Sequence, residues 1–216
     1  MARIALIHAL MQSIDPINEA MARDWPEVER QNLLDDSLSA DLARAGRLDA
    51  RMTQRFLTLA DYAVAQGAQG ILFTCSAFGP CIEAVARKHA SMPVLRPNEA
   101  MIDEAKALAR QSGKPIGLLA TFAPTLQTMP AEFGADLQVH TQLAEGALLA
   151  LQRGDGEGHD RQAADAAAAL AELGCGVIAL AQFSLARARQ AVEARTKLPV
   201  VTTVDSAVRR LRERLR

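Results

Sequence analysis

The chain has 216 residues, 50% of them apolar and 23% charged, and its formal net charge is −1. This composition is ordinary for a globular protein, and the near-zero charge excludes attraction of nucleic acid or of an anionic membrane surface by bulk charge. No apolar run approaches the ~20 residues that a membrane-spanning helix needs, and the first residues are typical of a core strand rather than a signal peptide. We therefore expect no nucleic-acid partner and no membrane partner.

Short β-rich runs alternate with longer helical patterns, which predicts an α/β fold with mostly parallel sheets flanked by helices. The clearest helix covers residues 49–65, because apolar residues recur there at helical spacing and Asp49 can cap its start. The Gly-rich stretch 153–158 is interpreted as a flexible turn between two helices, not as a phosphate loop. The predicted strands are 3–8, 28–34, 70–73, 94–95, 115–120, 137–140, 177–180 and 200–201. The other predicted helices lie near 15–23, 80–89, 98–111, 123–133, 143–152, 160–173, 184–195 and 203–215.

An internal repeat organises this alternation. In residues 66–99 and again in 173–205, a helix ends in Gly, a strand runs into a short loop, and a helix leads to Pro-Val and an acidic residue. The repeat predicts two similar lobes whose loops face one cleft, since ligands bind beyond the carboxyl ends of such strands. We expect 1–95 with 200–216 to form the first lobe and 96–199 the second, with approximate boundaries and strand swapping between the lobes.

The cysteines are Cys75, Cys81 and Cys175. An odd, small number argues against a disulfide framework and favours a reducing, cytoplasmic location. No Cys or His cluster has metal-ligand spacing, so no metal site is predicted. Cys75 ends a buried strand before a loop of small residues, whereas Cys81 is expected in the core and Cys175 lies in a turn at the wrong end of its strand.

The segment Ile71-Leu-Phe-Thr-Cys75-Ser-Ala-Phe-Gly-Pro80, together with the repeat, resembles the aspartate/glutamate/hydantoin racemase superfamily, which includes arylmalonate decarboxylase and maleate isomerase. The resemblance implies two pseudo-symmetric Rossmann-like lobes with a cleft between them. It also implies no metal, pyridoxal phosphate or nucleotide cofactor. Typical racemases of this group use two cysteines, one per lobe, which remove and return a proton on opposite faces of the α-carbon.

This sequence departs from that pattern in the second lobe. Anchoring the repeat on Gly67 and Gly174 pairs Cys75 with Gln182, and anchoring it on the Pro-Val prolines pairs Cys75 with Ala181. Neither an amide nor a methyl group can exchange a proton at useful pH. Two-base racemisation is therefore not expected.

Cys75 is the predicted catalytic residue, as a thiolate base or nucleophile. We expect the helix after Pro80 and the loop amides to lower the thiol's pKa; the alternative is a buried structural cysteine. Thr74, Ser76 and Thr121 offer hydroxyls that could bind a carboxylate, while Thr125 is interpreted as a helix cap. His8 could bind substrate or act as an acid or base, or be purely structural. The predicted substrate-binding residues are His8, Gln12, Thr74, Ser76, Ala77, Thr121, Gln182 and Phe183.

Two functions remain open. The first is a cofactor-independent enzyme acting at the carbon next to a carboxylate of a small acid, by racemisation, isomerisation or one-sided protonation after decarboxylation. The second is a catalytically lapsed protein that binds a small carboxylate as a sensor or carrier. A nucleotide-binding protein is rejected, because no Gly-x-Gly-x-x-Gly follows the first strand. The sequence leaves a homo-oligomer open.

Overall fold

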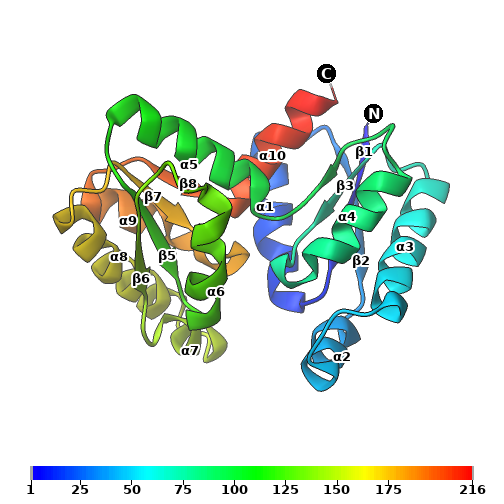
Figure 1. The fold of residues 1–216 in the computed structure, drawn as a ribbon, viewed down its shortest axis with the longest axis horizontal. Helices are drawn as coiled ribbons and strands as arrows, with labels where there is room; N and C mark the ends of the chain where they lie inside the picture. The colour runs from blue at the N-terminus through cyan, green and yellow to red at the C-terminus, as the bar shows by residue number, and fades with distance from the viewer. Residues whose placement is uncertain (1, 216) are drawn as a thin grey trace. The chain divides into compact units, whose positions relative to one another are not determined.

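The computed structural model describes residues 2–215, which form two units (Figure 1). The first unit combines residues 2–99 with 207–215, and the second is the continuous segment 100–206. Each unit contains one four-stranded parallel sheet flanked by helices, which confirms the predicted α/β class.

The first sheet has the strand order β2-β1-β3-β4. Its strands are β1 (Arg3–His8), β2 (Glu29–Leu34), β3 (Gly70–Phe73) and β4 (Val94–Leu95). The helical segments of this unit are η1 (Met11–Ser13), α1 (Ile14–Asp24), α2 (Ser37–Ala45), α3 (Ala50–Ala65), η2 (Ser76–Phe78) and α4 (Gly79–Lys88).

The second sheet has the order β6-β5-β7-β8, so it repeats the topology of the first. Its strands are β5 (Ile116–Ala120), β6 (Val139–Leu143), β7 (Val177–Leu180) and β8 (Val200–Thr202). The remaining helical segments are α5 (Glu99–Ser112), α6 (Ala123–Thr128), η3 (Met129–Phe133), α7 (Ala147–Gln152), α8 (Gly156–Glu172), η4 (Phe183–Ala188), α9 (Arg189–Thr196) and α10 (Thr203–Arg214).

The chain passes between the units inside two helices. Helix α5 begins at Glu99 of the first unit and continues into the second, and α10 begins in the second unit and continues into the first from residue 207. Leu211 of α10 is fully buried and lies against Gly70, where an added Cβ would sit 3.5 Å from its side chain. Helix α10 therefore covers part of β3.

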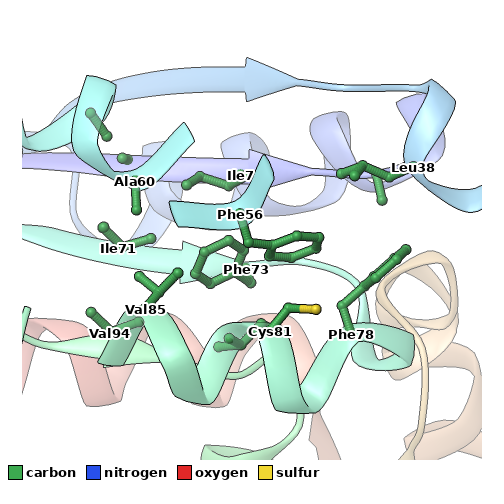
Figure 2. Close-up of a cluster of buried hydrophobic side chains, with 14 of the residues drawn as sticks. Ile7, Leu38, Phe56, Ala60, Ile71, Phe73, Phe78, Cys81, Val85 and Val94 are labelled. Carbon is green, nitrogen blue, oxygen red and sulfur yellow. The ribbon is translucent and has the colours of Figure 1, made fainter. Parts of the chain in front are cut away.

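The core of the first unit lies between its sheet and helices α3 and α4. Side chains alternate across a strand, so one face of β1 and β3 presents Ile7 and Phe73 to these helices. The Phe56 ring stacks on Phe73 with centroids 5.3 Å apart and contacts Phe78 at 4.9 Å. Figure 2 shows Cys81 among these buried side chains, where the sequence predicted it.

The core of the second unit has two layers. Leu119, Ile178 and Leu180 pack with α8, α9 and η4, while alternating residues of the same strands face α5 and η3. Gly117 brings α8 close to β5, because a Cβ there would lie 3.0 Å from Leu170. Burial on both faces explains why these strands are continuous apolar runs.

Helix α3 begins where the sequence predicted, because the Asp49 carboxylate accepts a hydrogen bond from Met52 N at 2.8 Å. Helix α2 was not predicted. The Gly-rich stretch was misjudged in part: Asp155 caps α8 by accepting from Gly158 N at 2.8 Å, so the helix begins at Gly156 instead of near residue 160. The second lobe was expected to end at residue 199, but β8 pairs with β7 and thus lies in the second sheet.

Candidate active site

Cys75 lies at the carboxyl edge of the first sheet, two residues after the end of β3. Its backbone is extended (φ −129°, ψ 121°), and it immediately precedes the single turn η2. The Cys75 side chain is half-buried, whereas Cys81 and Cys175 are buried and Ser76 and Ala77 are exposed. Of the three thiols, Cys75 is thus the one that a small molecule can reach.

The inner side of Cys75 faces a narrow apolar hollow. Burial raises the pKa of the Cys75 thiol, and the nearby amide of Ala77 lowers it by less. The expected lowering by a loop amide is present at Ala77, but the expectation of a lowered pKa is wrong, because desolvation outweighs it and α4 begins only at Gly79. At neutral pH Cys75 is a protonated thiol. The residues around the hollow are Ile7, His8, Ala9, Leu38, Phe56 and Phe73.

His8 ends β1 and is fully buried. Its Nδ1 lies 3.0 Å from Thr74 Oγ1 and 3.1 Å from Ser13 Oγ, and its Nε2 lies 3.0 Å from Asn32 Oδ1. The Ser13 hydroxyl donates to the Leu10 carbonyl at 2.7 Å. The consistent assignment has Thr74 O–H donating to Nδ1 and His8 Nε2–H donating to Asn32.

Burial favours the neutral form of His8. Burial lowers the pKa of His8, and the hydrogen bond to Asn32 opposes that shift only in part. With both ring nitrogens engaged and no exposed surface, His8 favours a positioning role over substrate contact. It holds Thr74, which is itself buried and precedes Cys75.

The partners of His8 had no signal in the sequence. Asn32 lies in β2 and meets His8 because β1 and β2 pair in parallel, whereas Ser13 lies in η1, the turn that follows β1. The buried histidine at a strand end was the one hint that such partners must exist. Gln12, also in η1, is exposed.

In the second unit, Thr121 follows β5 and Gln182 follows β7, and the two residues meet at the carboxyl edge of the sheet. The Oε1 atom of Gln182 accepts hydrogen bonds from Thr121 N at 2.7 Å and from Thr121 Oγ1 at 3.0 Å. Thr121 is buried, Gln182 is half-buried, and Phe183 is buried. Both hydrogen-bond donors of Thr121, its backbone N–H and its hydroxyl, are therefore bonded to Gln182. The Phe183 side chain packs into the protein interior.

Strand register decides between the two alignments of the repeat. Ile7 of β1 pairs with Phe73, the last residue of β3, and Leu119 of β5 pairs in the same way with Leu180, the last residue of β7. Phe73 and Leu180 are therefore equivalent positions, and so are the residues two places after them. Cys75 thus corresponds to Gln182, and not to Ala181. Both residues are extended and precede a 3₁₀ turn, Gln182 with φ −137° and ψ 150°. The prediction that these two loops line one cleft stays a prediction.

Within residues 2–215, no group of three or more His, Cys, Asp or Glu side chains could hold a metal ion. Among the same residues, no helix is long and apolar enough to cross a membrane.

The two parallel sheets have the same strand order, so the chain is an α/β protein built from a structural repeat. A half-buried thiol lies at the carboxyl edge of the first sheet. Residues 9–211 match the family of Asp/Glu/hydantoin racemases, and the chain belongs to that family. Racemases are enzymes, so the family confirms the expected enzyme class. No curated protein sequence matches the chain significantly.

Solved structures share the fold. Allantoin racemase from Klebsiella pneumoniae aligns with a TM-score of 0.73 at 20% identity, over 99% of this chain and 87% of that one. A glutamate racemase from Bacillus anthracis aligns with a TM-score of 0.70 at 12% identity, over 98% of this chain and 80% of that one. Unliganded arylmalonate decarboxylase aligns with a TM-score of 0.64 at 14% identity, over 99% of this chain and 94% of that one.

Proposed function

We propose that the protein is a cofactor-independent enzyme that acts at the carbon next to the carboxylate of a small acid, with Cys75 as its single catalytic thiol. The observation that carries this proposal is the strand register, which gives the two equivalent positions a thiol and an amide, Cys75 and Gln182. Only one of them can exchange a proton near neutral pH. The enzyme would therefore work on one face of the reacting carbon.

The proposed reaction passes through an enediolate. When the bond to a carboxyl group breaks and CO₂ leaves, or when the Cys75 thiolate takes up the α-proton and becomes the thiol, the electron pair stays on the carbon and spreads onto the neighbouring carboxylate oxygens. Hydrogen-bond donors lower the energy of that state as its charge develops. Cys75 S–H then gives its proton to the carbon, and the resulting thiolate regains a proton from water.

The raised pKa of Cys75 favours one variant of this reaction, protonation after decarboxylation. A protonated thiol is ready to donate, whereas proton removal needs the thiolate that burial disfavours. In this variant the bond to a carboxyl group breaks, CO₂ leaves, and Cys75 supplies the replacing proton. The fold likeness to arylmalonate decarboxylase is compatible with it.

The proposal requires a free thiol, which the reducing cytoplasm preserves. It also requires no metal or pyridoxal phosphate, so activity should survive dialysis against a chelator. Loss of activity that returns with zinc or pyridoxal phosphate would contradict this part.

The test follows the reacting carbon in D₂O. The protein is incubated with aspartate, glutamate, hydantoins and 2-substituted malonates. NMR follows two reactions: the disappearance of the α-¹H signal by exchange, and the conversion of a malonate to its decarboxylated product. We expect turnover of at least one compound, with deuterium delivered to one face, and no turnover by a Cys75→Ala variant. A Cys81→Ala variant serves as the matched thiol control.

Two outcomes would reject the proposal. Brisk racemisation of a pure enantiomer that Cys75→Ala abolishes would require a second acid-base group. Binding of small carboxylates without any turnover would instead identify a lapsed enzyme acting as a sensor or carrier.

A further inference from the structure

The amide of Gln182 has a fixed orientation. Its side-chain oxygen faces Thr121 N at 2.7 Å, and a backbone N–H can only donate, so the atom there must be Oε1 and not Nε2. The Thr121 hydroxyl adds a second bond to the same oxygen at 3.0 Å. Two donors from one residue therefore hold the amide plane.

This arrangement leaves the other end of the amide available. Within residues 2–215, Gln182 Nε2 has no hydrogen-bond partner, and it is not one of the buried unpartnered atoms. It therefore presents two N–H groups with access to solvent. A fixed donor loses less rotamer entropy on binding a ligand than a free side chain would.

The surroundings select the kind of acceptor. The segments 121–126 and 181–186 contain no charged residue, so an anion bound against these two segments would meet only neutral donors within them. Phe122, directly after Thr121 in the chain, is 52% exposed and gives this end of β5 an apolar surface. A carboxylate that carries an apolar group fits both features.

We propose that Gln182 Nε2 is a hydrogen-bond donor to the carboxylate of an acid with an apolar substituent, and that Thr121 is the positioning residue that fixes it. The identification of this carboxylate with the one next to the reacting carbon rests on the proposed function. Gln182 then contributes binding and charge stabilisation at the position where the repeat would otherwise have a thiol.

The test uses the full-length protein labelled with ¹⁵N and titrated with phenylacetate, with 2-phenylethanol as the matched ligand without a carboxylate. The side-chain amide signal of Gln182 is identified as the one missing from a Gln182→Glu variant. We expect phenylacetate to shift this signal in a saturable way and 2-phenylethanol to leave it in place. The absence of a shift with phenylacetate in the unmodified protein would overturn the inference, and this result does not depend on whether the variants fold.

The variants separate binding from positioning. Gln182→Glu keeps an oxygen for both Thr121 bonds but replaces the donor by a second oxygen, so phenylacetate affinity should fall at least 10-fold. Thr121→Val removes one of the two bonds, which corresponds to a roughly 2- to 10-fold loss of affinity and a changed amide signal of Gln182. Thr121→Ser should restore both.

Matched controls guard against general effects. Gln162→Glu makes the same charge change on exposed α8 surface, and Thr125→Val removes a hydroxyl in α6; neither should change affinity. An equal loss in Gln162→Glu and Gln182→Glu would overturn the inference. A Cys75→Ala variant should still show the phenylacetate shift of Gln182. An unmodified protein that shows this shift but turns over none of the tested acids would contradict the proposed function and leave this inference standing.

Discussion

At the scale of single residues, the three thiols differ in access. Cys81 and Cys175 are buried and Cys75 is half-buried, so brief iodoacetamide treatment should label Cys75 first. Because burial raises the pKa of Cys75, the thiolate is scarce at pH 7, and labelling should be slow there and accelerate up to tenfold per pH unit towards pH 9 and above. Mass spectrometry after timed quenching measures both effects. Rapid labelling at pH 7 would show a stabilised thiolate instead.

The register makes a prediction about restoring a second thiol. Gln182 and not Ala181 corresponds to Cys75, so Gln182→Cys should raise racemisation of a substrate that the protein already processes. Ala181→Cys should not, because that residue corresponds to Thr74 and is buried. Chiral chromatography of the product follows the change. A gain in Ala181→Cys alone would contradict the register argument.

His8 predicts a pH dependence of stability. Its folded-state pKa is below the ordinary 6.5, so the unfolded chain binds the extra proton as the pH falls through that value. The contribution of His8 to the unfolding free energy is fully present above pH 6.5. It should decrease on acidification by up to about 1.4 kcal/mol per pH unit.

The comparison with a His8→Asn variant isolates this effect from the carboxylates. Urea unfolding between pH 7 and pH 5 should show a smaller loss in the variant than in the unmodified protein. Equal pH dependences of the unfolding free energy in the two proteins would mean that burial does not lower the pKa of His8.

At the scale of elements, helix caps provide a matched pair. The Asp49 side chain accepts a hydrogen bond from Met52 N, whereas Asp36 precedes α2 without a capping bond from its side chain. Asp49→Ala should lower the unfolding free energy by about 0.5–2 kcal/mol, and Asp36→Ala by clearly less. Denaturant unfolding measures the difference. Equal losses would show that the Asp49 bond contributes nothing specific.

The elements that the sequence predicted well are those with redundant signals. Strands β3 and β7 are uninterrupted apolar runs, and α3 combines a cap with apolar residues at helical spacing. Helix α2 lacked such signals, because its apolar contacts are Leu38 and Leu42 among Ser and Asp residues. The start of α8 was hidden by glycines, which are typical of turns, and only the Asp155 carboxylate reveals the cap.

The same gap explains what the sequence missed at the candidate site. The position of Cys75 after a buried strand was predictable from local pattern. Its raised pKa was not, because Leu38 of the unexpected α2 lines the hollow beside the thiol. The Thr121–Gln182 bonds were also hidden, since they join residues 61 positions apart through the pairing of β5 with β7.

At the scale of the whole molecule, both units have uncharged loops after their central strands. Residues 9–13, 74–78, 121–126 and 181–186 include no Asp, Glu, Lys or Arg. An α-ammonium group bound against these four segments would meet no carboxylate within them, and leaving it unpaired on binding is costly. We therefore expect the protein to reject free amino acids.

Four compounds test this expectation in pairs. Phenylalanine and 3-phenylpropanoate share a carboxylate and a side chain, as do aspartate and succinate, and only the first of each pair carries an ammonium group. The affinity measured by NMR titration should be higher for the compound without the ammonium group in both pairs. Tighter binding of phenylalanine or aspartate would contradict the expectation.

The two chain crossings inside α5 and α10 set an order for biosynthesis. All residues of the second unit, 100–206, leave the ribosome before residues 207–215, which belong to the first unit. Leu211, which lies against Gly70, emerges only after the whole of the second unit. Because domains fold as units during synthesis, the second unit can fold while the first sheet still lacks the cover that Leu211 provides. The first unit, although its strands are synthesised earlier, therefore cannot complete its core until the second unit has been synthesised.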